Sequence, residues 1–182
     1  HNEKARSEDL LARLQKGETG ALISDAGTPL LSDPGYVLVR ACQQAGVKVA
    51  PVPGASALLA ALAAAGLPTD RFLFQGFLPA KGAVRDKALD EVLAQPVTVV
   101  LYEAPHRLLA LLQEVVAKEP QRELVLCREL TKRFETILRL PAADLLAAVA
   151  ADSNQQRGEI VLLVAPAAGR EQTDAELLRL AG

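Results

Sequence analysis

The chain has no methionine and no tryptophan, and only two cysteines among its 182 residues. Because a reading frame opens with methionine, the start at His1 leads us to expect that residues precede this sequence in the whole protein. Cys42 and Cys127 lie far apart and have no metal-ligating neighbours in sequence. This pattern favours buried thiols in a reducing compartment over a disulfide framework, and predicts a cytoplasmic protein without a metal site.

Long hydrophobic runs are also missing. The longest, residues 55–66, is too short and too rich in alanine to span a bilayer, and no signal-peptide pattern opens the chain. The formal net charge of −2 gives no global attraction to nucleic acid, so a polyanionic partner would have to meet a local basic patch. The H-E-x-x-H, Walker and G-x-G-x-x-G patterns do not occur, so nothing supports a hydrolase or a P-loop protein.

The residues that are present have the balance of a globular protein, 50% hydrophobic and 23% charged. In the first part, apolar spacing predicts helices over residues 2–18 and 36–45 and strands over residues 21–24 and 47–52. This order is typical of a parallel sheet covered by helices. The Pro53-Gly54 dipeptide marks a domain boundary, so residues 1–53 form the remaining part of a first domain.

The second part predicts a mixed α/β domain over residues 54–166 and a tail over 167–182, in which residues 174–180 begin a further helix. Apolar runs predict strands over residues 72–77, 98–102, 124–127, 136–138 and 160–164. Helical patterns cover residues 55–66, 105–118 and 141–151, and residues 81–93 form a basic amphipathic segment. The fold class is therefore α/β, with two domains that each contain a mostly parallel or mixed sheet covered by helices.

Four polar segments interrupt the apolar pattern, each at the end of a predicted strand: residues 24–35, 77–81, 102–107 and 128–135. The first, SDAGTPLLSDPG, predicts a shaped loop, which is either a ligand-binding loop or an ordinary strand-to-helix connection. We expect all four segments to gather at one edge of the sheets, where ligands bind in α/β proteins.

Basic side chains in these segments, Lys81, Arg107, Arg128, Lys132 and Arg133, suit a phosphate backbone. The alternative is that they are solvated loop residues paired with Glu103, Glu129 and Glu135. His106 could act as an acid or base, but its place after a strand and beside Pro105 favours a capping role at the next helix.

Six segments, taken in order, carry a family resemblance: SDAGTPLLSDPGYVLVR, PVPGASALLAALAAAGLPTDRF, GFLPAK, YEAPHRLL, RELTKRFET and RGEIVLLV. They resemble the bacterial small-subunit (16S) ribosomal RNA cytidine 2′-O-methyltransferases of the tetrapyrrole (corrin/porphyrin) methylase superfamily. The resemblance covers Asn2 to about Val164. YEAPHR, RELTK and the Ser24-Asp25-Ala26 start of the loop distinguish the ribosomal RNA branch from the porphyrin and precorrin branches.

The resemblance implies a homodimer that binds S-adenosylmethionine between two domains and methylates a cytidine ribose 2′-hydroxyl in 16S ribosomal RNA or the small ribosomal subunit, with no DNA or membrane partner. The implied cofactor-binding residues are Asp25, Ala26, Gly27, Thr28, Ala55, Ser56, Tyr102 and Glu159. The candidates for assisting the hydroxyl are Glu103, Glu129 and Lys132. The candidates for RNA phosphate contacts are Lys81, Arg107 and Arg133.

Two departures from the family stand out. The family opens with a strand and a glycine-rich loop similar to G-T-P-I-G-N-L, and this sequence does not contain them. We therefore expect the first domain to be incomplete here, and the chain as given could be active or inactive. The small helical domain that ends many members is matched by residues 174–180 alone. Two other functions stay open: a tetrapyrrole or other small-molecule methylase with a deep apolar pocket, and a non-catalytic RNA-binding or dimerisation module that binds no cofactor.

Overall fold

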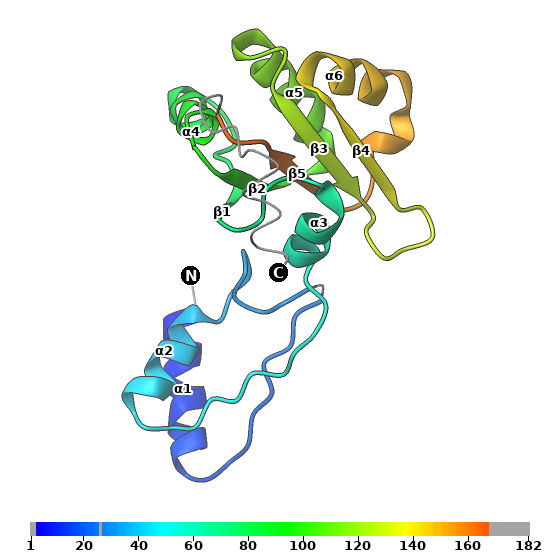
Figure 1. Ribbon diagram of the computed structural model, residues 1–182. Helices are drawn as coiled ribbons and strands as arrows, with labels where there is room; N and C mark the ends of the chain where they lie inside the picture. Colours follow the sequence, from blue (N-terminus) through cyan, green and yellow to red (C-terminus); the bar gives the residue numbers. More distant parts are fainter. Residues whose placement is uncertain (1–2, 26, 168–182) are drawn as a thin grey trace. The chain divides into compact units, whose positions relative to one another are not determined.

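The structure is a computed structural model that describes residues 3–25 and 27–167 (Figure 1). The chain divides into two compact units, residues 1–56 and residues 57–182. The boundary expected at Pro53-Gly54 stays a prediction of where the domains divide. The predicted helix at residues 174–180 lies outside the described residues. No helix in the described part of the chain combines the length and apolar character needed to cross a membrane.

The first unit contains two helices, α1 (Glu3–Gln15) and α2 (Tyr36–Gln44), which pack against each other. Helix α2 ends where Gly46 adopts a φ of 70°. There the amide of Gly46 donates to the Gln43 carbonyl and the amide of Val47 donates to the Cys42 carbonyl, so two orphan carbonyls of the last turn are satisfied. Both helices agree with the sequence prediction.

The two strands predicted in the first unit are wrong. Within residues 3–25 and 27–56 no strand forms, and residues 21–24 and 47–52 follow irregular paths. A strand exists only where its backbone groups pair with a neighbour, and no backbone hydrogen bond joins these two segments. The apolar side chains that suggested strands stay exposed, Ile23 by 86% and Val52 by 90%.

The second unit is built on a five-stranded mixed sheet in the order β1-β2-β5-β3-β4. Its strands are β1 (Phe72–Phe77), β2 (Thr98–Glu103), β3 (Glu123–Arg128), β4 (Thr136–Pro141) and β5 (Ile160–Val164). Strands β1 and β2 are parallel, whereas β5 runs antiparallel to both β2 and β3, and β4 antiparallel to β3. The α/β class with a mixed sheet is therefore confirmed, and the five strands fall where the sequence predicted them.

Helices cover both faces of this sheet (Figure 1). Helices α4 (Ala83–Leu93), α5 (Pro105–Lys118) and α6 (Ala142–Ala151) pack on the face formed by Val99, Leu101 and their in-register neighbours on β3 and β5. Helix α3 (Ala57–Ala65) packs on the opposite face, where Val100 and Val125 point. Because both faces are buried at the centre of the sheet, strands β2, β3 and β5 read as nearly continuous apolar runs.

Candidate functional site

Three of the four polar segments meet at one edge of the sheet in the second unit, here called the polar edge. Strands β1, β2 and β3 all end there, because Phe77 pairs with Tyr102, and Glu103 and Arg128 both face Ile160 at the start of β5. The expectation of a common edge is confirmed for these segments. The fourth segment, residues 24–35, belongs to the first unit.

Glu103 lies at the polar edge in a buried network of charges. Its carboxylate is fully buried, with Arg107 Nε 3.0 Å from Oε1 and Arg85 Nη1 3.6 Å from Oε2, and Oε1 also accepts the Ala104 amide at 2.8 Å. Arg85 is itself buried and donates to Glu114 at 2.7 Å. The buried carboxylates and guanidinium groups thus neutralise one another inside the protein, where a ligand does not reach the Glu103 carboxylate.

The same arginines hold the segment that follows β1. Arg107 Nη2 donates to the carbonyl oxygens of Leu78 at 2.8 Å and Pro79 at 3.1 Å, and Arg85 Nη1 donates to Pro79 O at 3.3 Å. Lys81, two residues further on, is exposed. The guanidinium of Arg107 is thus used inside the protein, to fix the backbone that leads to Lys81.

A second cluster at the polar edge joins Glu129, Lys132 and Glu159. Lys132 Nζ donates to Glu129 Oε1 at 2.8 Å and to Glu159 Oε2 at 3.1 Å, and the Glu159 amide donates to Glu129 Oε1 at 2.9 Å. The Lys132 ammonium lowers the pKa of the Glu129 carboxyl, with help from the Glu159 amide. The two carboxylates in turn raise the pKa of Lys132. At neutral pH the cluster holds one cation between two anions, with the Lys132 side chain 46% exposed.

The loop between β3 and β4, residues 129–135, is folded back on itself. Arg128, which is buried, donates from Nη2 to the Phe134 carbonyl at 2.9 Å, and the Thr131 amide donates to Glu135 Oε2 at 2.6 Å. Gly158 has a φ of 82°, and a Cβ built on it would overlap the Glu129 carboxylate. Glycine is therefore required where the chain passes this cluster.

Tyr102 lies on the other face of β2, toward α3. Its ring contacts Phe74 and Phe77 edge-on, with centroid distances of 5.0 and 5.8 Å. Burial raises the pKa of the phenol, and a hydrogen bond with the Leu58 amide, in the first turn of α3, works in the opposite direction. Phe77 is 50% exposed, so this aromatic surface is partly open.

Five of the predicted cofactor residues lie in the described part of the first unit: Asp25, Gly27, Thr28, Ala55 and Ser56. Two of them meet, because the Thr28 hydroxyl donates to the Ala55 carbonyl at 3.1 Å. The polar segment 24–35, which contains Thr28, has left-handed backbone at Gly27, Leu30 and Ser32. For the leucine and the serine this conformation is strained, as is common in ligand-binding loops. Ala26, also predicted, lies outside the described residues.

A family model for the tetrapyrrole (corrin/porphyrin) methylases matches residues 1–146. The chain belongs to this family. The methylase fold is also found in solved structures with less than 25% identity, which indicate the fold alone. The structure of the methyltransferase CobJ superposes with a TM-score of 0.66 at 24% identity, covering 94% of this chain and 74% of that one. The structure of cobalt precorrin-4 methyltransferase CbiF gives 0.62 at 19% identity, covering 88% and 69%.

Curated methylases of higher identity carry the name ribosomal RNA small subunit methyltransferase I. The protein from Pseudomonas aeruginosa is 56% identical over 99% of this chain and 65% of its own length. The protein from Escherichia coli O157:H7 is 51% identical over 98% of this chain and 63% of its own length. This chain thus spans a little under two thirds of these relatives.

Sequence reasoning missed several residues of the polar edge in this member of the family. Arg85 lies within a helix and its burial beside Glu103 has no local signal, since charged residues are normally exposed. Gly158 and the exposed ring of Phe134 were also missed, although Gly158 and Phe134 stand in the RGEIVLLV and RELTKRFET segments. Within the described residues no three His, Cys, Asp or Glu side chains gather as a metal site would need.

Proposed function

We propose that the protein is an S-adenosylmethionine-dependent methyltransferase that acts on the ribose 2′-hydroxyl of a cytidine in small-subunit ribosomal RNA. The observation that carries this proposal is the 56% identity, over 99% of this chain, to a protein named ribosomal RNA small subunit methyltransferase I. Residues 1–53 and 54–166 would be its two catalytic domains. A homodimer and a cytoplasmic location belong to the same proposal, because the family resemblance and the RNA substrate imply them.

Two features of the residues present fit the proposed cofactor. The Ser56 hydroxyl is buried and makes no hydrogen bond within the described residues, so a bound ligand could supply its hydrogen-bond partner. The partly open rings of Tyr102 and Phe77 offer an apolar surface for a purine. The residues that would hold the cofactor are Asp25, Ala26, Gly27, Thr28, Ala55, Ser56, Tyr102 and Glu159. When bound, S-adenosylmethionine supplies an activated methyl group on a sulfonium.

The protein's own part in the reaction is to orient the hydroxyl and receive its proton. Among the three candidates, Glu103 is best assigned to positioning, since its carboxylate is sealed between two arginines. We assign the binding of the substrate 2′-hydroxyl to the Glu129–Lys132–Glu159 cluster. The ammonium of Lys132 is half exposed and can bind the hydroxyl oxygen, and the Glu129 carboxylate lies beside it. Lys81 and Arg133 would contact phosphates, and Arg107 would act by fixing the backbone before Lys81.

Calorimetric titration with S-adenosylmethionine and S-adenosylhomocysteine tests the cofactor half of the proposal. We expect micromolar binding that Asp25→Ala weakens at least tenfold, whereas Asp9→Ala, an equal charge change in helix α1, leaves it unchanged. Tritium-methyl transfer to small subunits that lack the modification, followed by nuclease digestion and mass spectrometry, tests the substrate half. Absence of donor binding by the folded protein, or a methyl group on a base instead of a ribose, would contradict the proposal.

A further inference from the structure

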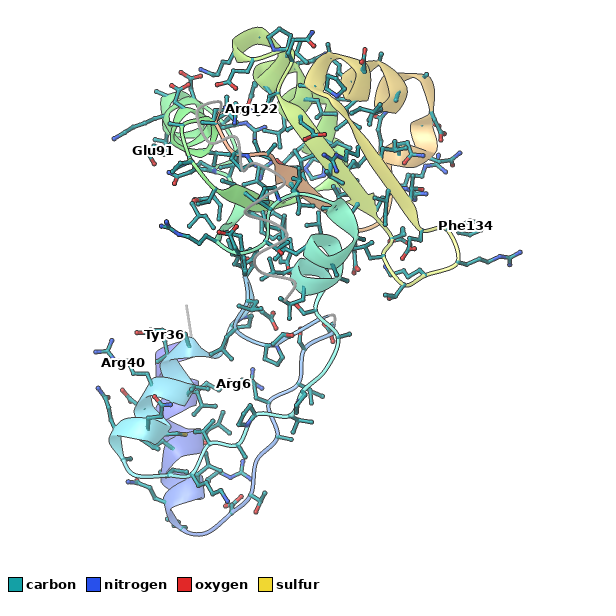
Figure 2. The ribbon with its side chains drawn as sticks, viewed as in Figure 1. Arg6, Tyr36, Arg40, Glu91, Arg122 and Phe134 are labelled. Carbon is teal, nitrogen blue, oxygen red and sulfur yellow. The ribbon has the colours of Figure 1, made fainter. Side chains whose placement is uncertain are left out.

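Phe134 is an exposed phenylalanine in a chain with few aromatic residues. The sequence contains four Phe and two Tyr, and three of the four Phe are on β1. Phe134 instead lies in the β3–β4 loop with 66% of its surface exposed. Figure 2 shows it on the outer side of that loop, where the chain returns to β4. No feature of the fold explains a large apolar ring at this position.

The backbone that carries Phe134 is fixed at several points. The Arg128 guanidinium holds the Phe134 carbonyl at 2.9 Å, the Glu135 carboxylate caps the Thr131 amide at 2.6 Å, and the Glu129 amide donates to the Glu159 carbonyl at 2.9 Å. A ring on an ordered loop loses little conformational entropy when a ligand packs on it. The loop therefore presents Phe134 ready for contact.

The charge beside the ring favours an anionic ligand. The Arg133 guanidinium carbon lies 5.5 Å from the Phe134 ring centroid, in cation–π range. Lys132 is neutralised by Glu129 and Glu159, whereas Arg133 has no carboxylate partner among the residues that the structure describes. A flat π face next to an uncompensated guanidinium matches a nucleobase and the phosphate that follows it.

We infer that Phe134 is a stacking platform for an unpaired base of the RNA substrate, with Arg133 bound to the neighbouring phosphate. Unpaired bases in RNA are recognised by stacking on aromatic rings, and this stacking works with any base because every base has a π face. The residues beside the ring in the sequence, Lys132, Arg133 and Glu135, are charged, which suits a polyanionic ligand better than an apolar protein partner. The inference rests on the proposed RNA substrate, and the loop's place beside the Glu129–Lys132–Glu159 cluster would direct a stacked strand to the polar edge.

RNA affinity and its salt dependence separate stacking from charge. With protein-free small-subunit ribosomal RNA in a filter-binding assay, Phe134→Ala and Phe134→Leu should weaken binding about 5- to 100-fold, while Phe134→Tyr keeps it. The slope of log affinity against log salt should not change in these variants. Arg133→Ala should reduce that slope by about one unit, because one phosphate contact is lost.

The absence of tryptophan from the sequence provides a direct probe. Phe134→Trp introduces a single indole whose emission should be quenched, saturably, by an oligocytidine RNA. Gln121→Trp is the matched control, since Gln121 is exposed in the turn before β3, at the other end of the strand that leads to Phe134, and carries no charge. Its emission should not change.

Four results would overturn the inference. Wild-type affinity in both Phe134→Ala and Phe134→Leu would show that the ring does not stack on RNA, and would leave the proposed function intact if methyl transfer is also unchanged. If the Phe134 variants lose binding to assembled subunits but keep binding to free RNA, the partner of the ring is a ribosomal protein. If these variants change the molecular mass measured by light scattering, the partner is a second copy of the chain. If the wild-type protein binds the methyl donor but no RNA, both the proposed RNA substrate and the stacking role of Phe134 are wrong.

Discussion

Gly158 lies so close to the carboxylate of Glu129 that no other residue type fits without displacing it. A residue with a Cβ also resists the φ of 82° found there, at a cost of about 1–2 kcal/mol. Gly158→Ala should therefore lower the free energy of unfolding by about 2 kcal/mol and weaken methyl transfer, because Glu129 is pushed from Lys132.

A double-mutant cycle in urea separates the two causes. In a Glu129→Ala background the overlap is relieved, so Gly158→Ala should cost about 1 kcal/mol less than in the wild type. Equal costs in both backgrounds would mean that the carboxylate is not what requires glycine.

The buried carboxylate of Glu103 should be important for stability. Glu103→Gln leaves Arg85 and Arg107 facing a neutral amide, and removal of one partner from a buried charge network costs about 3 kcal/mol. Glu91→Gln is the control, since Glu91 is 66% exposed and its pair with Lys87 is long, at 3.8 Å. Urea unfolding should show a shift for the first variant and less than about 0.5 kcal/mol for the second. A negligible effect of Glu103→Gln would contradict the network.

Acid should open the Glu129–Lys132–Glu159 cluster before it unfolds the protein. Folding lowers the pKa of Glu129 from its ordinary 4.5, so this contribution is present above pH 4.5 and is lost as the pH falls through the lower folded value. The pKa of Lys132 is raised from 10.5, so its contribution is present below pH 10.5 and is lost only above that.

Hydrogen exchange can follow this opening at the Glu159 amide, which donates to Glu129 Oε1. Its protection factor should be constant from pH 5 to pH 8 and fall only at pH values below 4.5, the ordinary pKa of a glutamate. The Glu129→Gln variant should show no such step. If the protection factor of the Glu129→Gln variant still falls in acid, a group other than Glu129 is responsible for the opening.

The cysteines should be inert in the folded protein. Burial, with a smaller contribution from Glu135, raises the pKa of the Cys127 thiol to about 11, and Cys42 is also buried. Because the thiolate is the reactive form, Ellman's reagent at pH 8 should label neither residue until denaturant is added. Cys42→Ser isolates the response of Cys127, and rapid labelling of this variant under native conditions would show that β3 opens locally.

Sequence patterns predicted the second unit well because apolar residues dominate its strands, of which β2, β3 and β5 are buried on both faces. The apolar runs of β1 and β5 and the helical period of α5 match the observed residues at both ends. The strands at residues 21–24 and 47–52 failed for a physical reason: an apolar run shows that a segment could pair, but it does not supply the partner.

The candidate site was predictable in its location and less so in the directions of its side chains. Glu129, Lys132 and Glu159 were all named from the sequence, yet nothing local indicated that Glu159, expected at the cofactor, would share Lys132 with Glu129. Arg107 resembles any exposed arginine of a first helical turn, and its inward hydrogen bonds to Leu78 and Pro79 depend on contacts 28 and 29 residues away.

The position of β5 has a consequence for how the second unit folds during synthesis. Strand β5 is the last strand in the sequence but lies between β2 and β3, which otherwise do not pair. Until residues 160–164 leave the ribosome, the parallel β1-α4-β2 unit and the antiparallel β3-β4 hairpin are separate pieces with open edges. Closure of the sheet therefore waits for its central strand, so this unit should fold in a late, cooperative step dominated by long-range contacts.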